Sequence, residues 1–266
     1  MIHLRSITLP SGDHGSGFPF SVPAISTLAE VEFDVPVAFF VGENGSGKST
    51  LLESLAIATG LPAVASAPPR DDATLSAQRK LAAALHLTWN RKTHRGFFLR
   101  AEDFFGFARS LSRTRDEMRQ RVAELEIEYG DRSAHARGLA QGPARASLAE
   151  MEKRYGEDLD ANSHGQAFFQ LFRSRLVPGG LYLLDEPETP LSPLSQLALL
   201  SMLKDMVGQD AQFIIATHSP ILLALPGAQI LDFDAPPIRR ASYEDLEHVR
   251  LTREFLADPE RFLRRL

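Results

Sequence analysis

Short apolar runs alternate with helical patterns along much of the chain. Val37–Val41 is continuously apolar, which is typical of a strand buried on both faces of a sheet. Similar runs return at Leu181–Leu184, Gln212–Ala216 and Ala228–Phe233, and helical patterns lie between the runs, the first at Lys48–Thr59. Strands that alternate with helices predict an α/β fold with a mainly parallel sheet flanked by helices.

Other parts of the chain depart from this alternation. Met1–Leu9 alternates apolar and polar residues, as a half-buried strand does. Leu85–Trp89 and Gly96–Arg100 flank a basic turn, so we expect a hairpin there. From Ala101 to Asp160 the sequence is charged and largely helical, with a loop predicted at Gly138–Pro143. This middle section is expected to form a helical subdomain inserted into the core.

The composition limits the class of protein. The 266 residues are 44% hydrophobic and 24% charged, as in globular proteins, and the net charge of -5 gives no overall attraction to nucleic acid. The chain has no cysteine, which excludes disulfides and cysteine-ligated metals. No apolar run reaches the roughly 20 residues that span a bilayer, and we find no secretory signal. We therefore expect a cytoplasmic protein without a transmembrane segment of its own.

The segment GENGSGKS, which begins at Gly42, satisfies the P-loop pattern G-x-x-x-x-G-K-[ST] between a strand and a helix. Glycines let successive amides point at one phosphate chain, and the helix presents its positive end to it. Lys48 is expected to bridge β- and γ-phosphate oxygens, and the Ser49 hydroxyl to bind Mg²⁺. The predicted nucleotide-binding residues are Gly42, Glu43, Asn44, Gly45, Ser46, Gly47, Lys48, Ser49 and Thr50.

Further candidates follow two other buried strands. Asp185 is expected at the C-terminal tip of its strand, the edge where parallel sheets bind ligands, and would order Mg²⁺. The adjacent Glu186 is the candidate general base for the water that attacks the γ-phosphate. His218 follows the strand that ends at Ala216 and would contact the γ-phosphate and this water. The predicted catalytic residues are therefore Glu186, His218 and Lys48.

GENGSGKST, LYLLDEPE and ATHSP, in this order, resemble the Walker A, Walker B and switch-histidine segments of the ATP-binding cassette (ABC) class of P-loop ATPases. DEPETPLSP and IIATHSPIL are most similar to small bacterial AAA-family ATPases related to the SMC and RecF-type ATPases. The resemblance implies one ABC-type ATPase domain over residues 1–266, with an antiparallel β part. Its implied parts are an N-terminal β part and P-loop core at 1–100, a helical subdomain at 101–177, and the C-terminal half of the core at 178–266.

The cluster Asn162-Ser163-His164-Gly165-Gln166 has two interpretations. By itself it is an ordinary helix start, because an Asn or Ser side chain before an apolar run can cap a helix. In the ABC class the matching position carries the signature, usually LSGGQ, which serves the nucleotide of a second subunit. The resemblance therefore implies an ATP-dependent dimer, packed head to tail, in which Ser163, His164, Gly165 and Gln166 act in trans.

Some segments depart from the pattern of transporter cassettes. Glu102 stands where these cassettes have a glutamine, and it could contact Mg²⁺ or its water, although its charge would repel phosphate. Thr189–Pro193 replaces the transporter-type S-x-L-D. Phe18 and Phe20 lie upstream of the P-loop and could stack on adenine or serve in packing. The basic segment Asn90–Arg95 could contact nucleic acid or act only as a solvated turn.

Three functions fit these motifs. The first is a Mg²⁺-dependent ATPase whose ATP-driven dimer drives or gates a partner activity in DNA maintenance or defence. The second is the ATP-binding subunit of an ABC transporter, against which Glu102, the unusual signature and the missing S-x-L-D argue. The third is a dimerisation switch that hydrolyses ATP slowly. We favour the first, because all the catalytic groups are present.

Overall fold

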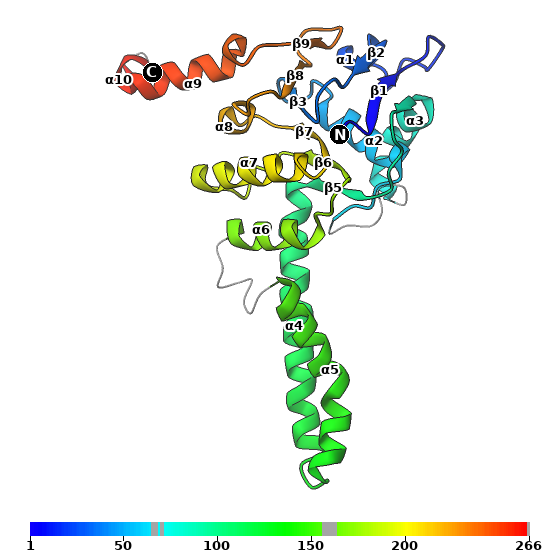
Figure 1. Cartoon of the computed structure of the whole chain (residues 1–266), viewed down its shortest axis with the longest axis vertical. Helices are drawn as coiled ribbons and strands as arrows, with labels where there is room; N and C mark the ends of the chain where they lie inside the picture. The colour runs from blue at the N-terminus through cyan, green and yellow to red at the C-terminus, as the bar shows by residue number, and fades with distance from the viewer. Residues whose placement is uncertain (65–68, 70–71, 156–163, 265–266) are drawn as a thin grey trace. The chain divides into compact units, whose positions relative to one another are not determined.

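The computed structural model of this chain describes residues 1–64, 69, 72–155 and 164–264 (Figure 1). The chain forms two compact units. The first consists of Met1–Ala101 together with Val177–Leu266, and the second consists of Glu102–Leu176. The second unit is therefore an insertion into the sequence of the first.

A six-stranded sheet with the strand order β5-β6-β7-β3-β8-β9 lies at the centre of the first unit. All neighbouring strands pair in parallel, except the last pair. Every residue of β3, β6 and β7 is buried, as their continuous apolar runs predict. The prediction of a mainly parallel sheet is confirmed. The strands are β3 (Val37–Val41), β5 (Gly96–Arg100), β6 (Leu181–Asp185), β7 (Gln212–Ala216), β8 (Gln229–Asp232) and β9 (Arg239–Arg240).

A separate antiparallel sheet has the order β2-β1-β4, with strands β1 (Leu4–Thr8), β2 (Glu30–Glu32) and β4 (His86–Trp89). The predicted hairpin between β4 and β5 is wrong, because β4 pairs with β1 and β5 pairs with β6. Gly96 permits the second pairing: its φ is 120°, and a Cβ there would lie 1.8 Å from the carbonyl oxygen of Leu181. The basic segment Asn90–Arg95 thus connects two sheets.

The buried side chain of Gln212 joins the two sheets. Its Oε1 accepts hydrogen bonds from the backbone N–H groups of His3 and Leu4, both at 2.8 Å. Its Nε2 donates to the carbonyl oxygen of Leu4 at 2.9 Å. Because all three bonds go to backbone groups at the start of β1, this one amide fixes the position of β1 against β7.

Helices cover the sheets of the first unit. The predicted helix over Lys48–Thr59 is confirmed as α2, whose side chains Leu51, Leu52 and Leu55 are fully buried in the core. Within the described residues, no helix combines the length and the apolar character needed to cross a membrane. The remaining helical elements are α1 (Pro23–Ser26), η1 (Ala73–Leu75), α3 (Ser76–Ala84), α7 (Pro193–Val207), α8 (Pro220–Leu223), η2 (Tyr243–Asp245), α9 (Glu247–Ala257) and α10 (Pro259–Leu263).

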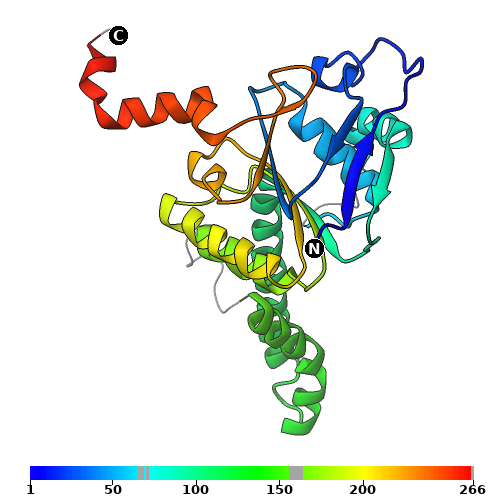
Figure 2. The ribbon, with the colours of Figure 1, turned by 45° about the horizontal axis from the view of Figure 1, so that its top comes forward.

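The second unit contains α4 (Ala101–Glu128), α5 (Ala134–Tyr155) and α6 (His164–Arg175). Figures 1 and 2 show α4 and α5 lying side by side. The predicted loop at Gly138–Pro143 is wrong, because this stretch is helical within α5 and the break comes at residues 129–133. The reason is tertiary: the buried Gln141 donates to Val122 O at 3.3 Å and to Glu126 Oε2 at 2.5 Å. These bonds hold α5 helical next to its proline.

Candidate functional site

The C-terminal ends of adjacent parallel strands bring most of the predicted site residues to one edge of the sheet. In the register of the strands, Asp185 on β6 pairs with Ala216 on β7, and Ala216 pairs with Phe40 on β3. The Walker A loop, Gly42–Gly47, follows β3, and His218 follows β7. The three motifs are far apart in sequence but meet at the edge where open α/β sheets bind ligands.

The Walker A loop enters α2 through glycines that adopt conformations most residues avoid. Gly42, Gly45 and Gly47 have φ values of 146°, 87° and 104°. Gly47 is the N-cap of α2, and a Cβ there would lie 2.9 Å from a side-chain carbon of Val22. Lys48, Ser49 and Thr50 form the first turn of α2, whose backbone N–H groups have no partner earlier in the helix. Such a helix end is suited to an anion.

The side-chain amine of Lys48, which follows the loop in sequence, is bound to the first residues of the loop. Its Nζ donates to the carbonyl oxygens of Gly42, at 2.6 Å, and Glu43, at 2.9 Å. Burial lowers the pKa of the Lys48 amine, and nearby carboxylates, with Asp234 the strongest, act against this shift. The amine is thus a buried donor bound to neutral carbonyls, from which an anionic phosphate can draw it.

Asp185 and Ser49 form the candidate metal-binding pair. The Ser49 hydroxyl donates to Oδ1 of Asp185 at 3.1 Å. Burial raises the pKa of Asp185 to about 7; the hydrogen bond from Ser49 and the nearby Arg100 oppose this rise, and Glu53 and Glu186 add to it. No cluster of three or more His, Cys, Asp or Glu in the described part of the chain could hold a metal. The pair still fits Mg²⁺, which takes oxygen ligands and commonly uses one or two protein groups plus phosphates and water.

Asp185→Asn is expected to raise the Tm measured without nucleotide or Mg²⁺, by roughly 2–6 °C at pH 8. The folded-state pKa of Asp185 lies above its ordinary value of 3.8, at about 7, so the folded protein binds a proton that the unfolded chain releases between these pH values. The associated stability is fully present below about pH 3.8 and is lost as the pH rises through about 7. Calorimetry at pH 5 should therefore give a smaller difference in Tm between Asp185→Asn and the wild type. An equal difference in Tm at pH 5 and pH 8 would contradict this account.

Glu186 has a strained backbone at the same edge. Its φ is 49°, a left-handed value that is uncommon for a residue with a side chain. Its N–H donates to the carbonyl oxygen of Ala216 at 2.9 Å, which ties it to the end of β7. Its Oε1 lies 3.8 Å from Nε2 of His218. The candidate base and the candidate switch histidine therefore face each other, and each side chain remains partly exposed.

Glu188 is a further candidate site residue, which the sequence reasoning missed. Its Oε1 accepts a hydrogen bond from the Thr217 hydroxyl at 2.6 Å and another from the His218 N–H at 2.8 Å. Glu188 thereby fixes the backbone on which His218 is carried, and burial raises the pKa of this carboxyl. Two features of the sequence could have indicated this contact: a second carboxylate shortly after Glu186, and a threonine just before His218.

Several predicted residues lie at the limits of the described structure. Ser163 is outside the described residues. His164, Gly165 and Gln166 form the first turn of α6, and Glu102 lies in the first turn of α4, but the described part of the structure does not include their side chains. All of these residues except Ser163 can thus be assigned to a helix, and their roles stay predictions.

The remaining candidates lie in the first unit. Phe20 stacks on His14 with 5.1 Å between ring centroids and packs against the core, whereas Phe18 is 54% exposed. A role for either ring in binding adenine stays a prediction. The segment Asn90–Arg95 contributes to a cavity of about 510 Å³ through Arg91, Lys92, Thr93, His94 and Arg95. Contact with nucleic acid there also stays a prediction.

This chain is similar to known proteins both in sequence and in fold. The family model described as "AAA domain, putative AbiEii toxin, Type IV TA system" matches residues 68–224. The chain is 31% identical over 205 residues to the cytochrome c biogenesis ATP-binding export protein CcmA of Paracoccus denitrificans (strain Pd 1222), which is 76% of this chain and 79% of that protein.

Solved structures with similar folds include a nucleotide-free ATP-binding cassette from an ABC transporter. It has 15% identity and a TM-score of 0.47, and the match covers 98% of this chain and 97% of that one. Another is the Smc head domain of Pyrococcus furiosus, with an extended coiled coil and bound to the C-terminal domain of ScpA. It has 11% identity and a TM-score of 0.46, and the match covers 96% of this chain and 100% of that one.

Proposed function

Because this chain belongs to the AAA-domain family whose model it matches, within the ATP-binding cassette (ABC) class of P-loop ATPases, we propose that it is a Mg²⁺-dependent ATPase that dimerises head to tail on ATP. As a member of this class, it binds and hydrolyses ATP. One observation carries the proposal: Lys48, Asp185, Glu186 and His218 come together at one edge of the sheet. The proposal also includes a bound Mg²⁺ ion, a dimer of two copies of this chain, and a partner activity that ATP hydrolysis drives.

Different residues of this chain bind the phosphates, activate the water and orient the reacting groups during hydrolysis. The glycine loop and the first turn of α2 bind the β- and γ-phosphates through backbone N–H groups, and Lys48 stabilises negative charge on their oxygens. Glu186 takes a proton from the attacking water, whose oxygen bonds to the γ-phosphorus as the bond to ADP breaks. His218 orients the γ-phosphate and this water. Ser49 and Asp185 would hold Mg²⁺, which neutralises phosphate charge.

A dimer with shared sites is expected to restore activity when two inactive variants are mixed. Lys48→Ala removes the Walker A function, and Ser163→Arg blocks the signature. In a mixed head-to-tail dimer one site pairs the intact Walker A loop of one copy with the intact signature of the other. Random mixing makes half of the dimers mixed, so we expect about a quarter of wild-type ATPase activity.

The control for this experiment is each variant alone, which should show background turnover. The outcome that contradicts shared sites is a mixture no more active than the two variants measured separately. A Ser163→Arg variant with full activity would instead favour the simpler interpretation of the cluster as a helix start.

We propose a defence process for the partner activity, because the description of the matching family includes a type IV toxin–antitoxin system. A second candidate is the ATP-binding subunit of a transporter, since the named relative is an export protein. Isolating the native protein under mild conditions separates the two. Recovery with an integral membrane protein would support the transporter subunit, and recovery with a partner that has no membrane-spanning segment would support the first candidate.

A further inference from the structure

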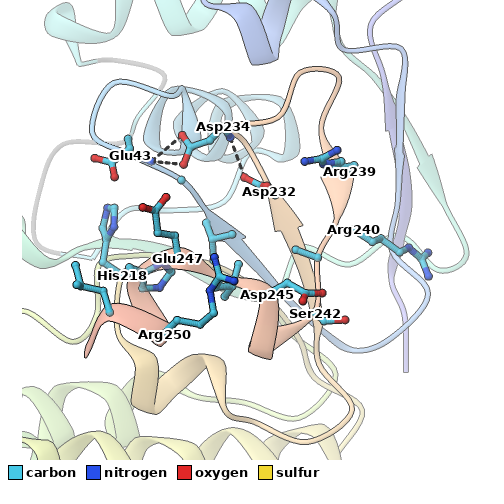
Figure 3. A pocket seen from close by; sticks show the side chains of 16 residues that line it. Glu43, His218, Asp232, Asp234, Arg239, Arg240, Ser242, Asp245, Glu247 and Arg250 are labelled. Atoms are coloured by element: carbon cyan, nitrogen blue, oxygen red, sulfur yellow. Dashed lines mark hydrogen bonds between the residues drawn. The ribbon is translucent and has the colours of Figure 1, made fainter. Parts of the chain in front are cut away.

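Asp234, just beyond the end of β8, binds the beginning of the Walker A loop. Its two carboxylate oxygens lie 2.8 and 2.9 Å from the backbone nitrogen of Glu43, which donates to both (Figure 3). The Asp234 N–H in turn donates to Oδ1 of Asp232 at 2.9 Å. This chain of contacts joins two segments that are 191 residues apart in sequence. It lies at a cavity of about 900 Å³ that Glu43, His218 and the C-terminal segment also line.

The contact acts on the same part of the loop that holds Lys48. Asp234 binds the Glu43 N–H, while Lys48 donates to the Gly42 and Glu43 carbonyl oxygens at 2.6 and 2.9 Å. The beginning of the loop is therefore bound by a carboxylate at its N–H and by an amine at its carbonyl oxygens. The amine must leave these carbonyls to reach a phosphate. The carboxylate of Asp234 then still binds the Glu43 N–H, and the Ser46 N–H still donates to the Glu43 carbonyl oxygen at 3.2 Å.

Gly42 is adapted to this contact. A Cβ at this position would lie 2.9 Å from Oδ1 of Asp234 and 2.8 Å from Oγ of Ser46, at a φ of 146° that a residue with a side chain rarely adopts. The first glycine of the P-loop pattern therefore does more here than let the chain turn. It lets the carboxylate of Asp234 approach the neighbouring N–H.

We propose that Asp234 is a positioning residue for ATP binding, which holds the Walker A loop in its phosphate-binding shape through the Glu43 N–H. The proposal rests on the nucleotide-binding role of this loop and does not depend on dimerisation. The negative charge of Asp234 contributes second to the hydrogen bond. Among the carboxylates near Lys48, Asp234 most strongly opposes the lowering of the Lys48 pKa by burial. The hydrogen bond and the charge can be separated, because asparagine keeps an acceptor oxygen and loses the charge.

The experiment compares Asp234→Ala and Asp234→Asn with the wild type, by steady-state hydrolysis of Mg·ATP and by calorimetric titration with Mg·ADP. We expect Asp234→Ala to raise the KM for ATP and the Kd for ADP about tenfold, with kcat within about threefold of wild type. Asp234→Asn should remain within about twofold of wild type in both constants. This division between KM and kcat, with rescue by asparagine, is not expected of a residue that only stabilises the fold.

Asp245→Ala is the matched control, because Asp245 is a carboxylate of η2 that lines the same cavity, whereas Asp234 is the one bound to the Glu43 N–H. It should leave KM, kcat and Kd unchanged. Asp232→Ala provides a second test that leaves Asp234 in place, and should raise KM about threefold by freeing the Asp234 backbone. The Tm of each variant without nucleotide establishes that it is folded.

Three results would overturn the proposal. They are an Asp234→Ala variant that binds nucleotide like the wild type, an Asp234→Asn variant as impaired as Asp234→Ala, or a loss confined to kcat. Failure of the wild type to bind Mg·ADP would instead contradict the nucleotide site itself. The titration therefore distinguishes an error about Asp234 from an error about the function of the loop.

Discussion

Lys48→Ala is expected to reduce ATP turnover at least about a hundredfold, to the background of the assay. Lys48 is the buried cation at the beginning of α2, and its amine is bound only to backbone carbonyl oxygens of the loop among the hydrogen bonds of the described residues. In the proposed mechanism it moves to the phosphates, where its positive charge stabilises their negative charge. We also expect weaker ATP binding, because the amine contacts the nucleotide before and during reaction.

Lys80→Ala is the control for this substitution. Lys80 is an exposed lysine of α3, and its removal should leave kcat and KM unchanged. Turnover is measured as phosphate release from Mg·ATP by variants of equal Tm. Normal turnover by folded Lys48→Ala protein would contradict the assignment of the Walker A loop as the phosphate site.

Glu186→Gln is expected to lower kcat by about 10²–10⁴ while leaving ATP binding intact. Glutamine has the same shape as glutamate and can adopt the same backbone, including the φ of 49° and the hydrogen bond from its N–H to Ala216 O. What it lacks is the carboxylate that takes a proton from water. The strain at this position supports a functional role, since a left-handed non-glycine residue costs about 1–3 kcal/mol and persists mainly where it aims a side chain.

The contrast with Lys48→Ala identifies the two roles. Lys48→Ala should impair both ATP binding and kcat, whereas Glu186→Gln should impair kcat alone. The measurement is a Kd for ATP from titration together with kcat from phosphate release. A Glu186→Gln variant that keeps more than about half of the wild-type kcat would show that another group acts as the base, and the nearest candidate is then His218.

The local patterns of the sequence predicted well where the central candidate residues lie in the fold. The limits of α2 and the buried strands follow from apolar runs and from glycines, so Lys48, Asp185 and His218 could be expected at one edge of a parallel sheet. The hairpin at Leu85–Arg100 could not be corrected from local signals, because the partner strands β1 and β6 lie elsewhere in the chain. Spacing alone makes neighbouring strands resemble a hairpin.

The residues that hold the site in place were harder to find. Glu188 binds the backbone of His218 over a separation of 30 residues, and Asp234 binds that of Glu43 over 191. No local pattern in the sequence indicates either contact, because a carboxylate can accept a hydrogen bond from any backbone N–H that the fold brings close to it. Similarly, Gly138 and Pro143 suggested a loop, and the hydrogen bonds of Gln141 to α4 explain the helix.

The most direct test of the central claim is the mass in solution of Glu186→Gln protein, by light scattering, without nucleotide, with Mg·ADP and with Mg·ATP. Loss of the general base should trap the ATP-bound state, and nucleotide shared between two copies favours the dimer by mass action. We expect the mass of 29.4 kDa to double with Mg·ATP and to remain monomeric with Mg·ADP. A protein that binds Mg·ATP but stays at the monomer mass would contradict the head-to-tail dimer.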